Sequence, residues 1–170
     1  MRAIMISIKP QWVKKILSGE KTIEVRKNKP KIETPFKCYI YETKGQYVKS
    51  KNGACTKYGY GCGKVVAEFV CNKVQDNFKY LVTPKGLKNA CLEEEEVENY
   101  LGNNGGYGWH ISELKVYEKP KELGEFYQNI KCNSCKASGY ESSACQYDEN
   151  CIVPIPLKRP PQSWQFVEEI

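Results

Sequence analysis

The sequence predicts a small, mainly β domain with flanking helices, an α+β chain whose short strands form a mostly antiparallel barrel. Two observations predict this class. Stretches of strand character outnumber helical ones, and the two helical stretches are too few for the crossovers of a doubly wound parallel sheet. A length of 170 residues favours one domain with room for a modest insertion. We therefore expect residues 1–170 to form a single domain.

A strand and a helix open the chain. AIMISI, residues 3–8, has the length and composition of a buried strand. Pro10 suits the first turn of a helix, where its missing N–H is not needed, and Gly19 suits a helix end. An apolar stripe at helical spacing lies between them, formed by Trp12, Val13, Ile16 and Leu17. We expect this stripe to pack one short helix against the core.

A charged strand follows this helix. In TIEVR, residues 22–26, the apolar positions alternate with Glu24 and Arg26, which therefore share one face of a strand. Lys21 lies at the bend where the strand begins. A solvated strand face would explain these charges, and so would a pocket that binds or cuts an anion. Both interpretations stay open from the charges alone.

The remaining elements are mostly strands. Strand character recurs in residues 36–43, 64–74, 106–119 and 163–169. The second helical stretch is acidic and covers residues 87–104, where the EEEE run is expected to be a solvated helix face. Residues 44–63 are rich in Gly, Lys and Tyr without an apolar period, which favours a mobile loop or the tip of an inserted hairpin.

Basic residues gather at the start of the chain. The net charge is +6, and residues 1–37 alone carry ten Lys or Arg against three Glu. A basic end of a small domain is typical of proteins that bind a polyanion, although a solubility face is the plain alternative. No apolar run approaches the roughly 20 residues that span a bilayer, and no signal-peptide layout is present. We expect a cytoplasmic protein that does not bind membranes.

Four of the nine cysteines form a separate pattern. Cys132, Cys135, Cys145 and Cys151 have the spacing C-x2-C-x9-C-x5-C. Four thiolates in a short polar segment suit a tetrahedral zinc ion, whose binding would supply the folding energy that the segment lacks. Free or disulfide-linked cysteines are the alternative. We therefore expect a candidate structural zinc site in an insertion at about residues 131–152.

Aromatic and acidic side chains provide further candidates for a binding site. Several aromatic residues lie among basic ones, namely Tyr39, Tyr41, Tyr58, Tyr60, Tyr107 and Trp109. A base stacked on such a ring gains roughly 1–3 kcal/mol. Tyr41 and Trp109 are our candidates for stacking, with packing of Trp109 in the core as the alternative. Glu68, unusual in an apolar strand, is either a further member of the site or a solvent-facing residue.

The charged strand resembles a known family motif. Gly19, Lys21, Glu24 and Arg26 match G-x-K-x-x-E-x-R of ASCH (activating signal cointegrator homology) domains, in the expected order of strand, helix and strand. Residues 107–120 and 159–169 also look like bacterial and phage members, and the Cys-rich segment would be an insertion. The resemblance implies the small barrel of PUA-like RNA-binding domains, with a cleft lined by the motif and by aromatic side chains.

The resemblance also implies two kinds of function. The first is binding of RNA or a modified nucleotide by a basic cleft containing Lys21, Glu24, Arg26, Glu68, Tyr41 and Trp109. The second is hydrolysis, because one small relative cleaves N4-acetylcytidine with a Lys, a Thr and a distant Glu, and other members have been described as ribonucleases. Lys21 and Glu24 would then be catalytic, with Glu24 in place of the Thr and the distant Glu among residues 93–96. An interaction module ordered by zinc is the third alternative.

Overall fold

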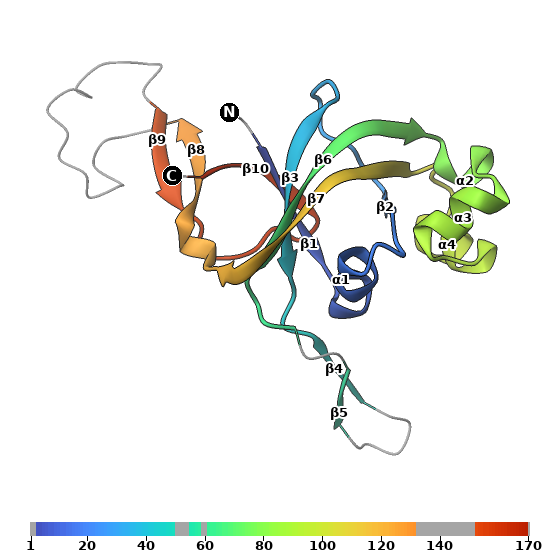
Figure 1. Cartoon of the computed structure of the whole chain (residues 1–170), viewed down its shortest axis with the longest axis horizontal. Helices are drawn as coiled ribbons and strands as arrows, with labels where there is room; N and C mark the ends of the chain where they lie inside the picture. The colour runs from blue at the N-terminus through green and yellow to red at the C-terminus, as the bar shows by residue number, and fades with distance from the viewer. Residues whose placement is uncertain (1–2, 50–54, 59–60, 132–151, 170) are drawn as a thin grey trace, which may run out of the picture.

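The computed structural model describes residues 3–49, 55–58, 61–131 and 152–169 and shows one large mixed β-sheet with four short α-helices (Figure 1). The elements are β1 (Ala3–Ile8), α1 (Pro10–Leu17), β2 (Ile23–Arg26), β3 (Phe36–Glu42), β4 (Gln46–Lys49), β5 (Cys55–Tyr58), β6 (Val65–Asp76), α2 (Phe78–Leu81), α3 (Pro84–Ala90), α4 (Glu94–Leu101), β7 (Tyr107–Lys121), the 3-10 turn η1 (Leu123–Glu125), β8 (Phe126–Lys131), β9 (Ile152–Pro156) and β10 (Trp164–Glu169). The prediction of a mainly β chain with few helices is confirmed.

The eight-stranded sheet has the order β2-β7-β6-β3-β1-β10-β8-β9. Strands β1 and β3 are parallel, with α1 and β2 in the connection between them, and the other ladders are antiparallel. This order places β2, which carries the charged motif, at one edge beside β7. The neighbouring β4–β5 hairpin forms a separate two-stranded sheet that projects away from the large one (Figure 1).

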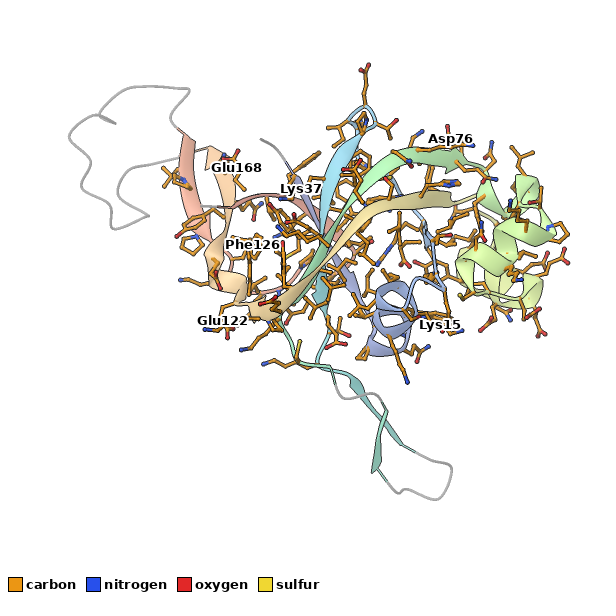
Figure 2. The ribbon with its side chains drawn as sticks, in the orientation of Figure 1. Lys15, Lys37, Asp76, Glu122, Phe126 and Glu168 are labelled. Atoms are coloured by element: carbon orange, nitrogen blue, oxygen red, sulfur yellow. The ribbon has the colours of Figure 1, made fainter. Side chains whose placement is uncertain are left out.

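The sheet curls but does not close through hydrogen bonds. Strands β7 and β8 lie near opposite edges of the sheet, yet only residues 122–125 separate them in the chain. The sheet must therefore curl until the end of β7 meets the start of β8, and Phe126 lies inside the curl (Figure 2). Among the described residues no ladder joins the edge strands β2 and β9. The expected closed barrel is thus corrected to an open, curled sheet, in which the short connection of residues 122–125 joins β7 to β8.

Burial on both faces of β1 explains why its sequence is apolar at every position except Ser7. All six of its residues are buried. One face, with Ile4 and Ile6, packs against Val13 and Ile16 of α1. The other face contributes to a second cluster inside the curl, formed by Ala3, Met5, Tyr39, Tyr41, Val65, Phe126, Leu157 and Val167. A strand that is covered on both faces has no face turned to solvent, so its sequence does not alternate between apolar and polar residues.

Helices α2 to α4 cover the edge strand β2. Ile23 and Val25 pack against Phe78, Ala90, Val97 and Leu101 in a third cluster. The single acidic helix expected over residues 87–104 is in fact two helices, because Cys91 adopts a left-handed backbone conformation (φ 52°) and ends α3. A capping box between Glu93 and Glu96 then begins α4. Within the described part of the chain, these helices and α1 are too short or too polar to cross a bilayer.

The Cys-rich segment connects two paired strands. Strands β8 and β9 are antiparallel, and Lys131 is the register partner of Ile152. The described chain therefore leaves and re-enters the sheet at adjacent positions, as expected for an insertion between hairpin strands. The four candidate zinc ligands, Cys132, Cys135, Cys145 and Cys151, lie outside the described residues.

Candidate functional site

The charged motif of β2 forms a buried cluster. Lys21, Glu24 and Arg26 are 3%, 6% and 7% exposed. Among the residues whose burial the structure describes, they are the only charged side chains that are buried. A solvated strand face, one of the two interpretations of the sequence, does not describe them. Burying charge is costly unless the charges are paired and hydrogen-bonded, so this cluster must be held together by specific contacts.

Glu24 lies between the two cations. Its Oε2 is 3.4 Å from the Lys21 Nζ, and its Oε1 is 3.1 Å from the Arg26 Nη2. The bend before β2 allows this approach, since Lys21 precedes the strand and is held there by a hydrogen bond from its backbone N–H to the Lys15 carbonyl. One carboxylate thus faces two cations, and the cluster retains one positive charge.

Lys21 has two further contacts. Its ammonium donates to the Ala90 carbonyl at the end of α3, at 2.6 Å. It also lies 5.2 Å from the ring centre of Trp12 on α1, within the range of a cation–π interaction. These contacts fix the ammonium between two helices that are far apart in the sequence.

Arg26 is anchored but not saturated. Its Nη2 donates to the Ser7 carbonyl at 2.7 Å. Its Nε is buried and has no hydrogen-bond partner in the described protein. Because a guanidinium offers five N–H donors in a fixed plane, Arg26 keeps donor capacity beyond its contacts with Ser7 and Glu24, and a phosphate oxygen is an acceptor that suits it.

The cluster lies in the wall of a cleft of about 1060 Å³. The lining comes from the end of β1, the start of α1, β2, the segment after β3, α4 and the segment before β10. It includes Ser7, Lys9, Trp12, Lys21, Glu24, Arg26, Thr43, Glu96, Asn99, Tyr100, Pro161 and Gln162. Ligand pockets are commonly about 300–1,000 Å³, so the cleft has room for more than a nucleoside.

Two aromatic side chains frame the cleft. Trp12 extends from α1 beside Lys21, and Tyr100 extends from α4. Burial raises the pKa of the Tyr100 hydroxyl, with Arg26 opposing and Glu24 reinforcing this effect. Tyr100 as a whole is 42% exposed, and the centre of its ring lies 5.3 Å from the Lys27 Nζ. A partly exposed ring beside cations is suited to stacking on a base.

The structure also distinguishes among the four glutamates of residues 93–96. Glu96 is the one that lines the cleft. Its Oε2 accepts a hydrogen bond from the Glu93 N–H at 2.9 Å, as part of the capping box of α4. Its carboxylate is therefore oriented by the start of α4 in the lining of the cleft.

Glu68 belongs to a different cluster. It lies on β6, where its Oε2 accepts from the Tyr117 hydroxyl at 2.5 Å and pairs with the Lys37 Nζ at 2.9 Å. Lys37 lies well away from α1 and its Lys15 (Figure 2). Burial by itself would raise the pKa of Glu68, but the hydrogen bond and the ion pair outweigh it and lower the pKa. Glu68 is not part of the cleft lining.

Because the pKa of Glu68 is lowered on folding, its contacts stabilise the protein above the usual glutamate pKa of about 4.3 and lose that effect as the pH falls through the folded value. We expect Glu68→Gln to lower the free energy of unfolding by about 1 kcal/mol at pH 7. The deficit should shrink at pH 3 in urea unfolding. Glu118→Gln, at an exposed position of the neighbouring strand β7, is the control. A deficit equal at both pH values would contradict this account.

Trp109 and Tyr41 lie in the core rather than in the cleft. Trp109 is fully buried, with its ring 5.6 Å from Phe36 and 6.2 Å from Trp164. Tyr41 is 5% exposed and belongs to the cluster inside the curl. A base cannot stack on a ring enclosed by other side chains, so the proposed stacking roles of both residues are corrected to structural ones.

A substitution separates these roles for Trp109. We expect Trp109→Phe to lower the free energy of unfolding by about 1–2 kcal/mol, because a smaller ring leaves part of the space unfilled. Ligand affinity should stay unchanged when measured on the folded protein. Trp12→Phe, in the cleft, is the comparison and should weaken binding with a smaller effect on stability. If Trp109→Phe weakened binding and Trp12→Phe did not, the stacking role of Trp109 would be restored.

The sequence did not predict that some residues, Trp12 among them, would line the cleft. Trp12 was expected in the core because it shares an apolar helical stripe, yet it is partly exposed at the cleft. Ser7 was the available signal, as a polar residue in an otherwise apolar strand. Its hydroxyl donates to the Pro161 carbonyl at 2.6 Å and its carbonyl accepts from Arg26. Contacts between residues 7 and 161 depend on the sheet order and could not be read from spacing.

Comparison with known proteins bears on the fold. No family model matches the chain, and no curated protein matches it. Solved structures of ASCH from Zymomonas mobilis do match. The unmodified protein is 18% identical, with a TM-score of 0.54 over 98% of this chain and 87% of that one. A serine-to-alanine variant is 17% identical, with a TM-score of 0.58 over 98% and 88%. A tyrosine-to-phenylalanine variant is 19% identical, with a TM-score of 0.51 over 71% and 76%. This chain therefore has the ASCH fold.

Proposed function

We propose that the cleft binds a nucleotide or a short stretch of single-stranded RNA, held by Lys21, Glu24 and Arg26. The observation that carries this proposal is the buried cluster with one surplus positive charge and an unpartnered Arg26 Nε in a roomy cleft. Such a cluster leaves a surplus positive charge in the wall of the cleft for an anionic ligand to meet.

Each residue has a plausible contact in such a complex. Arg26 presents a planar fork that matches a phosphate or the edge of a base. Glu24 is able to accept from the amino group of cytosine while holding the two cations in place. Trp12 and Tyr100 offer ring faces to an unstacked base. Single-stranded or flipped-out bases are the form of nucleic acid that such a cleft accepts.

Titration with nucleosides, nucleotides and short RNAs, monitored by calorimetry and followed by chromatography of the products, tests the proposal. A phosphate-led complex should lose affinity steeply as salt rises. Lys21→Ala should weaken binding, whereas Lys14→Ala, on the exposed face of α1, should have little effect. Absence of binding to every member of the panel would overturn the proposal, and a salt-independent affinity would point to a neutral nucleoside.

Hydrolysis is the second candidate, and one observation favours it. Glu96 lines the same cleft as the Lys21–Glu24 pair, so an acid and an amine face one bound molecule. An N4-acetylated cytidine or a single-stranded RNA would be the substrate. The product analysis decides: turnover that is abolished by Lys21→Ala and by Glu96→Gln indicates an enzyme, and intact ligand after prolonged incubation indicates a binding module.

We propose that the Cys-rich segment binds one structural zinc ion per chain through Cys132, Cys135, Cys145 and Cys151. The pairing of Lys131 with Ile152 supports this, because it brings the two ends of the segment together. Elemental analysis of the purified protein should give about one zinc per chain. Chelation should lower the thermal midpoint without reducing binding in the cleft. Less than half a zinc per chain would contradict the assignment.

A further inference from the structure

A second hollow adjoins the cleft. Its volume is about 460 Å³, and it lies over the end of β9, the start of β10 and the segment that joins them. Residues 160–162 line both the cleft and this second hollow. The two spaces are therefore neighbours. Residues 160–162 lie between them and are called the wall below.

The wall is held in place by the same residue that holds Arg26. Pro161 is buried, and its carbonyl accepts a hydrogen bond from the Ser7 hydroxyl at 2.6 Å. The Ser7 N–H donates to the Ser163 carbonyl at 3.0 Å, and the Ser7 carbonyl accepts the Arg26 Nη2 at 2.7 Å. Two adjacent prolines limit the backbone further. Ser7 thus fixes the Arg26 guanidinium and the wall relative to each other. A single ligand that contacts both needs this fixed distance.

The second hollow has the chemistry of a phosphate site. Lys158 and Arg159 line it, both are exposed, and neither has an ion-pair partner among the described residues. No acidic residue appears in the described lining. The Gln165 Nε2 in the same lining is buried without a hydrogen-bond partner. Two exposed cations without an ion-pair partner among the described residues suit the oxygens of a phosphodiester.

We infer that the ligand of the cleft is a strand of at least two nucleotides, which crosses the wall at residues 160–162 and places its next phosphate over Lys158 and Arg159. This inference builds on the proposed function and names its ligand class as an oligonucleotide rather than a free nucleoside. An acidic peptide would also satisfy the cations, but it has no use for the ring faces of Trp12 and Tyr100 or for the acceptor Glu24 in the cleft.

Homopolymeric RNAs of one to four nucleotides, each of the four bases, are titrated by calorimetry at several salt concentrations. Affinity should rise at least tenfold from one to three nucleotides. The double variant K158A/R159A should lose about tenfold in affinity for the trinucleotide and flatten its salt dependence by about 0.7 in slope, the value for one phosphate contact on a single strand. Mononucleotide affinity should change less than twofold.

The matched control is K14A/K31A, which removes the same charge from exposed positions that line neither hollow. An equal loss in this control would show a general charge effect and overturn the inference. Binding of mononucleotides without any gain from length would overturn it while leaving the proposed function intact. Absence of binding to every RNA would overturn both. Competition by a poly-glutamate peptide as strong as by the trinucleotide would replace the RNA strand by an acidic peptide.

Discussion

Glu24→Gln is expected to lower the free energy of unfolding by about 3–5 kcal/mol, the cost of breaking a buried charge pair from one side. Among the described residues, Glu24 is the one carboxylate in contact with both Lys21 and Arg26, at 3.4 and 3.1 Å. Glutamine keeps the shape of the side chain but not its charge, so two buried cations would face each other without a counterion. The loss is a large share of the stability of an ordinary domain.

Urea unfolding of the variant and the wild-type protein measures this loss. Glu33→Gln, at an exposed position in the connection after β2, is the matched control and should change stability by less than about 0.5 kcal/mol. Phosphate added to the buffer should raise the thermal midpoint of Glu24→Gln more than that of the wild type, because an anion in the cleft would replace the missing carboxylate. A variant as stable as the wild type would show that the cations are not paired in solution.

Arg26→Lys is expected to weaken binding of a mononucleotide by about 10- to 100-fold. Lysine keeps the positive charge but loses the planar fork, so it cannot hold the Ser7 carbonyl, Glu24 and a ligand oxygen together. A hydrogen bond to a charged group contributes roughly 1.5–3 kcal/mol, which corresponds to this range of affinity. Calorimetry with a single nucleotide, on protein shown to be folded by circular dichroism, gives the ratio.

Arg159→Lys is the matched control, because it makes the same chemical change at an exposed arginine outside the cleft lining. It should leave mononucleotide affinity within twofold. An equal affinity of Arg26→Lys and wild type would mean that charge alone, and not the geometry of the guanidinium, determines binding. The cleft would then bind anions by charge alone and would not be a specific nucleotide site.

Local patterns predicted most of the elements. The helix of residues 10–17 was evident from its apolar stripe and the strand of residues 3–8 from its length and apolar composition, and the structure confirms both. The break between α3 and α4 was missed, since it depends on the left-handed conformation of Cys91 and on a capping box within a run of glutamates. The sequence predicted a closed barrel, whereas the sheet is open. The number of short strands indicates a curved sheet, but the strand order decides whether the two edge strands pair, and that order is not visible in the sequence.

The site was predictable where it is local and not where it is formed by distant segments. Lys21, Glu24 and Arg26 lie within six positions of each other, and their convergence follows from one bend and one strand. Glu68 and Trp109 were misplaced because alternation along a strand does not say which face meets the cleft. Tyr100 and Pro161 reach the cleft from elements far along the chain, and only the fold brings them to Arg26.

The most direct test of the central claim observes the Arg26 side chain itself. The chain has three arginines, so its Nε–H signals in a ¹⁵N-correlation spectrum are few, and Arg26→Lys assigns the one that matters. On titration with a mononucleotide, we expect the Arg26 Nε–H signal to shift with the same affinity that calorimetry gives, while the Arg159 signal stays in place. Binding that leaves the Arg26 signal unmoved would contradict the account, because the ligand would then lie outside the Lys21–Glu24–Arg26 cleft.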